Sequence, residues 1–129
     1  MFVRSQQVRI GAPLSFDEQH PLPTSLELLL GALGSDVAVS LIALANKKRV
    51  EIDNVEVVVE GSIDNPLVWL GVIGEEGTTA LQHASVKVYV GTFETAERIN
   101  PVWTEAVSRS PLVSTLQRAL ELDLQMVIV

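Results

Sequence analysis

The segment from Ser25 to Asn46 constrains the fold of this 129-residue chain more than any other stretch. Of its 22 residues, 14 are Leu, Ile, Val or Ala, and they surround a helical cylinder instead of forming a single stripe. Thr24 and the carboxylate of Glu27 form a capping-box pattern, which predicts that the helix begins beside Thr24. We expect such a helix to be covered on nearly all sides.

One charged residue, Asp36, lies near the middle of this apolar segment. The helix is long enough to cross a membrane. A carboxylate at the bilayer centre would cost about 2.5–3.5 kcal/mol on insertion scales, so we expect no membrane role. The start of the chain has no apolar core of signal-peptide length, which favours a cytoplasmic protein.

Strands and shorter helices are predicted on both sides of the central helix. Alternating apolar and polar residues predict strands over 2–10, 52–63, 67–73, 84–90 and 120–126. Helical patterns cover 95–108, with a start or kink at Pro101, and 110–118, where Ser110 and Pro111 are typical of a cap and a first helical position. The order predicts one α+β domain over residues 1–129, with a mostly antiparallel sheet around the central helix.

Composition excludes several classes of function. The net charge is −7 and the acidic residues are scattered, so we expect neither a nucleic-acid partner nor an anionic membrane partner. The basic run Lys47-Lys48-Arg49 suits the carbonyl end of the helix. The chain has no cysteine, which excludes disulfides, thiolate nucleophiles and thiolate metal sites.

The remaining candidate residues have simple structural interpretations. His20 and His83 fall in predicted loops, where we expect solvent exposure, and no spacing of metal ligands predicts a metal or another cofactor. Gly31 and Gly34 are expected to permit close backbone packing of the helix. We expect the two tryptophans, Trp69 and Trp103, to anchor the core or an interface.

A family resemblance lies in the order and spacing of two stretches of the chain. They are TSLELLLGALGSDVAVSLIALANKKRVEIDNVEVVVEG and RSPLVSTLQRALELDLQ. Together they resemble the OsmC/Ohr family of osmotically inducible and organic hydroperoxide resistance proteins. The resemblance covers about Leu22 to the C-terminus and implies an OsmC-like domain with a shortened N-terminal region. It also implies an intertwined homodimer, in which the central helices and sheets of two chains share one core.

This chain departs from the family at the residues that carry the family's chemistry. Asp36 stands where the resemblance places the peroxidatic cysteine, and Ser110 stands at its resolving partner. The family's glutamate position falls on Leu26, with Glu27 beside it, and the family's arginine has only Arg4 and Arg9 as candidates by location. A carboxylate and a hydroxyl cannot pass through a sulfenic acid and a disulfide, so a thiol peroxidase is excluded.

Two interpretations of Asp36 remain open from the sequence. Asp36 either forms a hydrogen bond to Ser110 or an ion pair to an arginine such as Arg109, or it serves a site as a general base or ligand anchor. The expected ligand residues are Asp36, Ser40, Arg109 and Ser110. The favoured function is a redox-silent homodimer with a small apolar ligand pocket at the interface. The alternatives are a non-redox enzyme that uses Asp36 as acid or base, and a purely structural or interaction protein.

Overall fold

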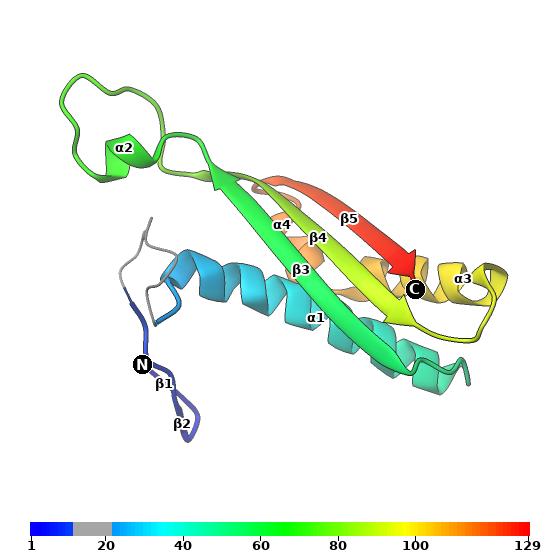
Figure 1. Ribbon diagram of the computed structural model, residues 1–129. Helices are drawn as coiled ribbons and strands as arrows, with labels where there is room; N and C mark the ends of the chain where they lie inside the picture. Colours follow the sequence, from blue (N-terminus) through cyan, green and yellow to red (C-terminus); the bar gives the residue numbers. More distant parts are fainter. Residues whose placement is uncertain (12–21) are drawn as a thin grey trace.

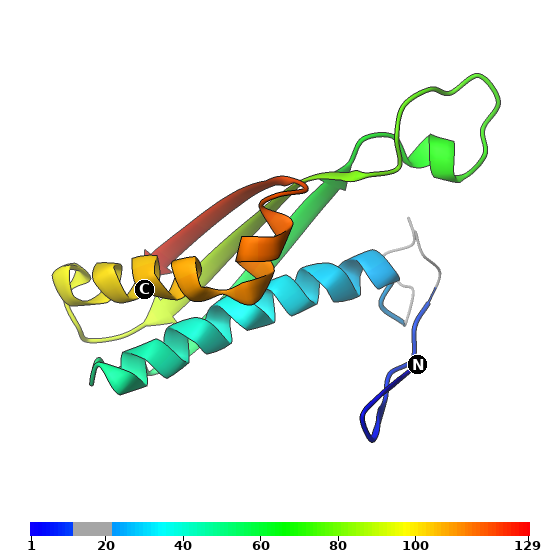
Figure 2. The same ribbon diagram turned by 180° about the vertical axis from the view of Figure 1, so that it is seen from behind.

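The computed structural model describes residues 1–11 and 22–129, and a three-stranded sheet forms the centre of this part. Its strands are β3 (Asn54–Ile63), β4 (Leu81–Gly91) and β5 (Glu121–Ile128), in the order β3–β4–β5. Helices α1 (Ser25–Lys47), α3 (Ala96–Arg109) and α4 (Pro111–Leu116) cover one face of the sheet and leave the other open (Figures 1 and 2). The predicted α+β class and OsmC-like architecture are confirmed.

The strand pairings follow from the connections. β3 and β4 are antiparallel and are joined directly, so Val57 lies opposite Val88. β4 and β5 are parallel because α3 and α4 form the crossover between them. Alternate residues face the helices, and those of β4 are fully or almost fully buried: Ala84, Val86, Val88 and Val90.

The capping box of α1 forms as the sequence predicts. The Thr24 hydroxyl accepts a hydrogen bond from the Glu27 N–H at 3.1 Å, and the Glu27 carboxylate accepts one from the Thr24 N–H at 2.8 Å. At the other end, Arg49 has a φ of 57°, which turns the chain out of the helix after Lys48. Local interactions and backbone geometry therefore explain where α1 begins and ends. Both ends lie within about one residue of the predicted boundaries.

One side of α1 is buried and the opposite side is open. The buried side packs on the sheet and α3 through Leu33, Gly34, Val37, Leu41, Leu44 and Ala45. On the outer side, Val39 is 61 % exposed and Ile42 is 40 % exposed. By length and composition α1 could cross a membrane, but its inner side is the core of a soluble OsmC-like fold. Within one chain, the expectation of cover on nearly all sides is not met.

The predicted strand over 2–10 is wrong. Residues 1–8 instead form a small hairpin of β1 (Phe2–Val3) and β2 (Gln6–Gln7), with Arg4 at a φ of 55° in the turn. The turn divides the predicted strand because a positive φ reverses the chain direction there. This hairpin lies apart from the sheet in both views (Figures 1 and 2).

The predicted strand over 67–73 is also wrong. The segment begins with the short helix α2 (Pro66–Trp69). The Asn65 side-chain oxygen caps this helix by accepting a hydrogen bond from the Leu67 N–H at 3.0 Å. Asn before Pro is thus a helix cap here, as Ser110 before Pro111 is for α4. Residues 64–80, hereafter the arm, project beyond the end of the sheet (Figure 1).

Two further boundaries differ from the sequence prediction. α3 runs through Pro101 from Ala96, so the proline neither starts nor ends it. β4 begins at Leu81, which places His83 in a strand and half-buried instead of in an exposed loop. His20 lies outside the described residues. Of the two tryptophans, Trp103 packs against the core, whereas Trp69 is 48 % exposed on the arm, so a core role for Trp69 is wrong.

Candidate functional site

Asp36 and Ser110 meet although they are 74 positions apart in the chain. Asp36 lies on α1, and Ser110 is the residue between α3 and α4 that caps α4. The Ser110 hydroxyl donates a short hydrogen bond to the Asp36 carboxylate, and the Leu112 N–H donates a second one at 3.2 Å. Of the partners that the sequence left open for Asp36, the structure shows the hydrogen bond to Ser110.

The same contact satisfies the start of α4. The Ser110 hydroxyl accepts from the Val113 N–H at 3.2 Å while it donates to Asp36. Two N–H groups that a helix start leaves unpaired, those of Leu112 and Val113, thereby receive acceptors. The Leu112 contact was not predicted, although the cap pattern at Ser110 and Pro111 implied free N–H groups at this place.

The burial of Ser110 limits what the pair can do chemically. The Ser110 side chain is 0 % exposed, whereas Asp36 is half-buried. A nucleophilic hydroxyl must reach its substrate, and this hydroxyl is enclosed and engaged in two hydrogen bonds. The geometry therefore suits a link between α1 and α4 better than a Ser–Asp catalytic pair.

The arginine alternative for Asp36 is not realised in the described part of the chain. Arg109 instead pairs with Glu105 on its own helix at 2.8 Å. Arg4 lies in the turn of the N-terminal hairpin and Arg9 follows that hairpin, and both are exposed. Asp36 is thus held by neutral donors.

Glu105 is the meeting point of a small ion-pair group between α1 and α3. It pairs with Lys48 at the end of α1 as well as with Arg109. The hydrogen bond from Lys48, followed by the charge of Arg109, lowers the pKa of Glu105 from its ordinary value of 4.5. Lys47 makes no ion pair among the described residues.

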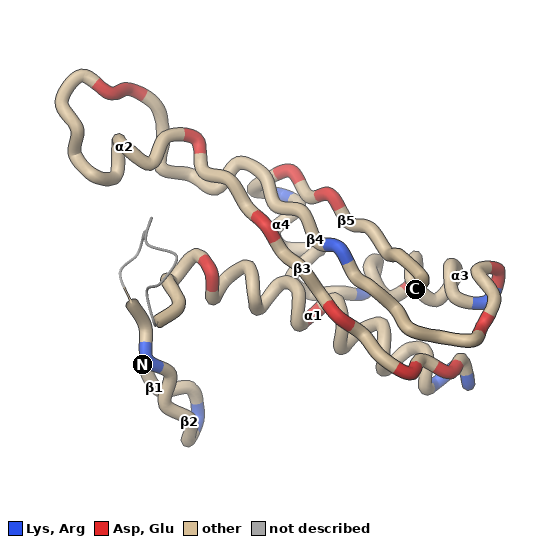
Figure 3. The backbone as a smooth tube through the Cα atoms, viewed as in Figure 1, with Lys and Arg blue, Asp and Glu red and all other residues tan. Residues whose placement is uncertain are grey.

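Ser40 and Arg109 lie in a hollow next to the Asp36–Ser110 contact rather than in it. Ser40 is one turn beyond Asp36 on α1, and the hollow of about 200 Å³ lies between α1 and α3. Its lining is largely apolar and includes two cations, Lys47 and Arg109. Figure 3 shows how Lys, Arg, Asp and Glu are distributed along the backbone. We call it the α1–α3 hollow; it is lined by Ser40, Ala43, Leu44, Lys47, Ala106 and Arg109.

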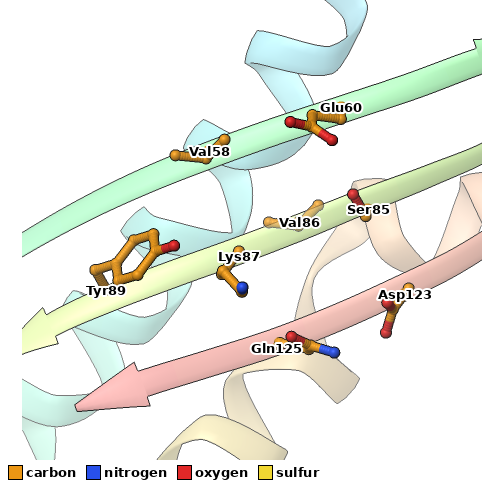
Figure 4. Close-up of a pocket in the computed structure, with 8 residues that line it drawn as sticks. All are labelled: Val58, Glu60, Ser85, Val86, Lys87, Tyr89, Asp123 and Gln125. Carbon is orange, nitrogen blue, oxygen red and sulfur yellow. The ribbon is translucent and has the colours of Figure 1, made fainter. Parts of the chain in front are cut away.

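Two other hollows are lined by neither Asp36 nor Ser110. One of about 250 Å³ lies between α1 and β3, beside Gly34 and Val57. The other, of about 240 Å³, lies on the open face of the sheet, where Lys87 stands among Glu60, Tyr89 and Asp123 (Figure 4). Lys87 approaches the Tyr89 ring at 6.0 Å from its centroid, a weak exposed cation–π contact.

His83 lies on this open face opposite Glu121 of β5. Within residues 1–11 and 22–129, three or more His, Asp or Glu side chains nowhere gather in a group that could hold a metal ion. We therefore assign no residue of the described chain to a metal.

The family model for OsmC-like protein matches residues 17–125. The chain belongs to the OsmC family. This OsmC-like match spans α1, β3, β4, the first part of β5, and Asp36 and Ser110. A comparison with curated proteins gives no sequence match.

Solved OsmC-like structures have the same fold. An OsmC-like protein from Mycoplasma pneumoniae superposes with a TM-score of 0.82 at 18 % identity, over 99 % of this chain and 86 % of that one. An organic hydroperoxide resistance protein OsmC from Legionella pneumophila gives 0.63 at 11 % identity, over 84 % and 72 %. The organic hydroperoxide resistance protein OhrB of Bacillus subtilis gives 0.57 at 14 %, over 84 % and 73 %. At these identities the likeness shows the fold of this OsmC-like protein and not its activity.

Proposed function

We propose that this OsmC-like protein is a redox-silent, cytoplasmic homodimer that binds a small apolar ligand at its dimer interface. The observation that carries the proposal is the Asp36–Ser110 hydrogen bond in a chain without cysteine. Family resemblance places two thiols at these positions, and here a non-reactive polar contact joins the same two helices. The architecture around a reactive pair is kept while its redox chemistry is absent.

The outer side of α1 supports the dimer. Five exposed small or apolar residues follow one another there at helical spacing: Ala32, Ser35, Val39, Ile42 and Ala43. We call them the outer ridge of α1. An exposed apolar strip of this length on a central helix is typical of an interface, and small side chains allow close approach of a second helix.

The N-terminal hairpin supports an intertwined arrangement. Its apolar side chains find no cover in the chain itself, since Phe2 is 73 % exposed and Val3 is 53 % exposed. The hairpin extends away from the body (Figure 1), where a partner could bury it. Both edges of the sheet, β3 and β5, are also open for contact with a second chain.

The α1–α3 hollow indicates the class of ligand. Ala43, Leu44 and Ala106 offer apolar surface, and the hollow borders the outer ridge, so a partner chain would enclose it. Arg109 and Ser40 at its rim supply a charged donor and a hydroxyl. We therefore propose a lipophilic, medium-chain carboxylic acid or its ester, with the polar end towards Arg109.

A thermal-shift series with medium-chain fatty acids and their methyl esters tests this ligand class. We expect acids to raise the melting temperature in a concentration-dependent way, as for any ligand that binds only the folded state. Arg109→Gln should weaken the response to the acids more than to the esters. Arg98→Gln, on the exposed part of the same helix, is the matched control.

A lack of response to every acid and ester would favour the structural or interaction role instead. The non-redox enzyme is not favoured by any observation, because the Ser110 hydroxyl is enclosed as a helix cap.

A further inference from the structure

Hydrogen bonds tie together the two ends of the arm between β3 and β4. At its base, the Asp64 carboxylate accepts from the Thr78 N–H at 3.0 Å. Asn65 donates to the Glu75 carboxylate at 3.0 Å and to the Glu76 carbonyl at 3.1 Å. Three glycines at positive φ shape the turns between these bonds: Gly71, Gly74 and Gly77. Polar groups thus hold the arm together without a core of its own.

The apolar side chains of this arm face solvent. Ile73 is 100 % exposed and Trp69 is 48 % exposed, and between them Leu70 and Val72 are 48 % and 45 % exposed. Solvent-facing loops of a monomer are normally polar, so a cluster of this kind marks a contact surface. Trp is also among the residues that contribute most to the free energy of binding at interfaces.

The negative charge of the arm limits which class of partner it can bind. Asp64, Glu75 and Glu76 are its charged residues, and it carries no Lys or Arg. An anionic membrane surface or a nucleic acid would repel it. The favoured partner is an apolar protein surface with cations at its rim.

The chain itself carries such a surface. The α1–α3 hollow has an apolar floor, and Lys47 and Arg109 stand at its rim with Lys48 nearby. One acidic residue, Glu105, is paired there, and it is shared between Lys48 and Arg109. Lys47 also helps to lower the pKa of Glu105 through its charge, but it forms no ion pair among the described residues and can meet an external carboxylate.

The arm cannot reach the hollow of its own chain. The base of the arm lies beside Leu30, which would touch a Cβ at Gly61 at 3.1 Å. The hollow begins at Ser40 and ends at Lys47, so its middle lies about 20 Å along α1 at 1.5 Å per residue. The arm points away from that end of the molecule (Figures 1 and 2).

A second copy removes this obstacle if the two outer ridges face each other in antiparallel orientation. That orientation brings the arm end of one copy to the hollow end of the other. It also separates the Lys47-Lys48-Arg49 runs of the two copies, which a parallel orientation would bring together at an energetic cost. By two-fold symmetry the contact forms twice.

We propose that the arm of each copy docks on the α1–α3 hollow of its partner, with Trp69 and Ile73 over the apolar floor and Glu76 facing Lys47. This inference rests on the proposed homodimer. It makes the ligand pocket a composite of two chains, in which the arm is the wall that a single chain lacks.

Cysteine cross-linking tests the contact cleanly, because the natural chain has no cysteine. Copies with Ile73→Cys and copies with Ser40→Cys, carrying different tags, are co-expressed and treated with a short bismaleimide. We expect a covalent heterodimer. The matched control replaces Ile73→Cys by Phe93→Cys, which is also 100 % exposed but follows β4 at the opposite end from the arm, and should give no such product.

Sedimentation of the unmodified protein separates the two proposals. Arm docking is overturned if the protein is a dimer but Ile73→Cys and Ser40→Cys copies do not cross-link. It is also overturned if the Phe93→Cys control gives as much cross-linked heterodimer. Either result leaves the proposed homodimer standing. A monomer at micromolar concentration overturns both. As an independent measurement, Glu76→Lys should raise the dimer dissociation constant about fivefold, since exposed ion pairs contribute little each. Combining it with Lys47→Glu should restore the constant, and failure to do so contradicts the proposed charge contact.

Discussion

At the residue scale, two hydrogen-bond donors determine how much the Asp36 carboxylate contributes to the stability of the fold. Removing a buried carboxylate that is poorly paired can stabilise a protein. Asp36 is well paired, because the Ser110 hydroxyl and the Leu112 N–H both donate hydrogen bonds to it. Asp36→Ala should lower the free energy of unfolding by about 1–3 kcal/mol by leaving these donors unpaired. Asp36→Asn, which keeps an acceptor oxygen, should cost less.

Urea unfolding at one fixed protein concentration measures the loss. Ser35→Ala, at the exposed neighbouring position, is the control and should change stability little. An Asp36→Ala protein as stable as the wild type would show that burial of the carboxylate costs as much as its hydrogen bonds contribute.

Glu105 makes a pH-dependent contribution whose sign follows from its neighbours. Lys48 and Arg109 hold its pKa below the ordinary value of 4.5 in the folded state. A depressed pKa contributes stability above the ordinary value, and this is lost as the pH falls through the folded-state pKa. The melting temperature of Glu105→Gln should therefore lie below that of the wild type at neutral pH and approach it in acid.

Glu97→Gln on the same helix serves as the control, because Glu97 is exposed and forms no ion pair among the described residues. A constant difference between Glu105→Gln and the wild type at every pH would contradict the assignment.

At the scale of elements, Gly34 sets the distance between α1 and β3. A Cβ at this position would lie 2.5 Å from the Val59 Cγ2 and 3.0 Å from the Val57 Cγ1. Gly34→Ala should destabilise the fold by about 1–3 kcal/mol through overpacking. That loss would exceed the gain of up to about 1 kcal/mol in helix propensity.

Gly31 provides the comparison on the same helix. No heavy atom lies within 4 Å of a Cβ placed there, so close packing at Gly31 was a wrong prediction within one chain. Gly31→Ala should leave thermal stability equal or higher. A Gly34→Ala protein that behaves like Gly31→Ala would show that α1 can shift away from β3 at little cost.

At the scale of the whole molecule, we expect an obligate homodimer that buries well over ~2,000 Å² in total, as permanent interfaces do. The reason is the exposed apolar surface of one chain, on the outer ridge of α1, on the N-terminal hairpin and on the arm. Analytical ultracentrifugation at micromolar concentration is the measurement. A stable folded monomer is the contrary result.

Peroxide chemistry is the second prediction for the molecule as a whole. Purified protein with a dithiol reductant should consume no organic hydroperoxide beyond the background of the reductant, since no thiolate exists to attack the peroxide. Asp36→Cys with Ser110→Cys tests whether the pair alone suffices. We expect no recovery, because the family's glutamate position is Leu26 and no arginine contacts Asp36 in the described chain.

The sequence by itself determined the elements whose signals are local. The capping box fixed the start of α1, Ser110-Pro111 fixed the start of α4, and alternation fixed the strands of the sheet. The absence of cysteine alone excluded thiol chemistry. The spacing of the two family segments predicted that Asp36 and Ser110 meet.

Only the tertiary structure decided how these elements are used. The hydrophobic stretch 67–73 has the composition of a strand, but its segment starts as a helix because no neighbouring strand competes with the Asn65 cap. The Leu112 donor, the α1–α3 hollow and the open outer side of α1 each depend on the placement of α1 against α3 and α4. Contacts between segments dozens of residues apart come from packing, and a local pattern carries no information about them.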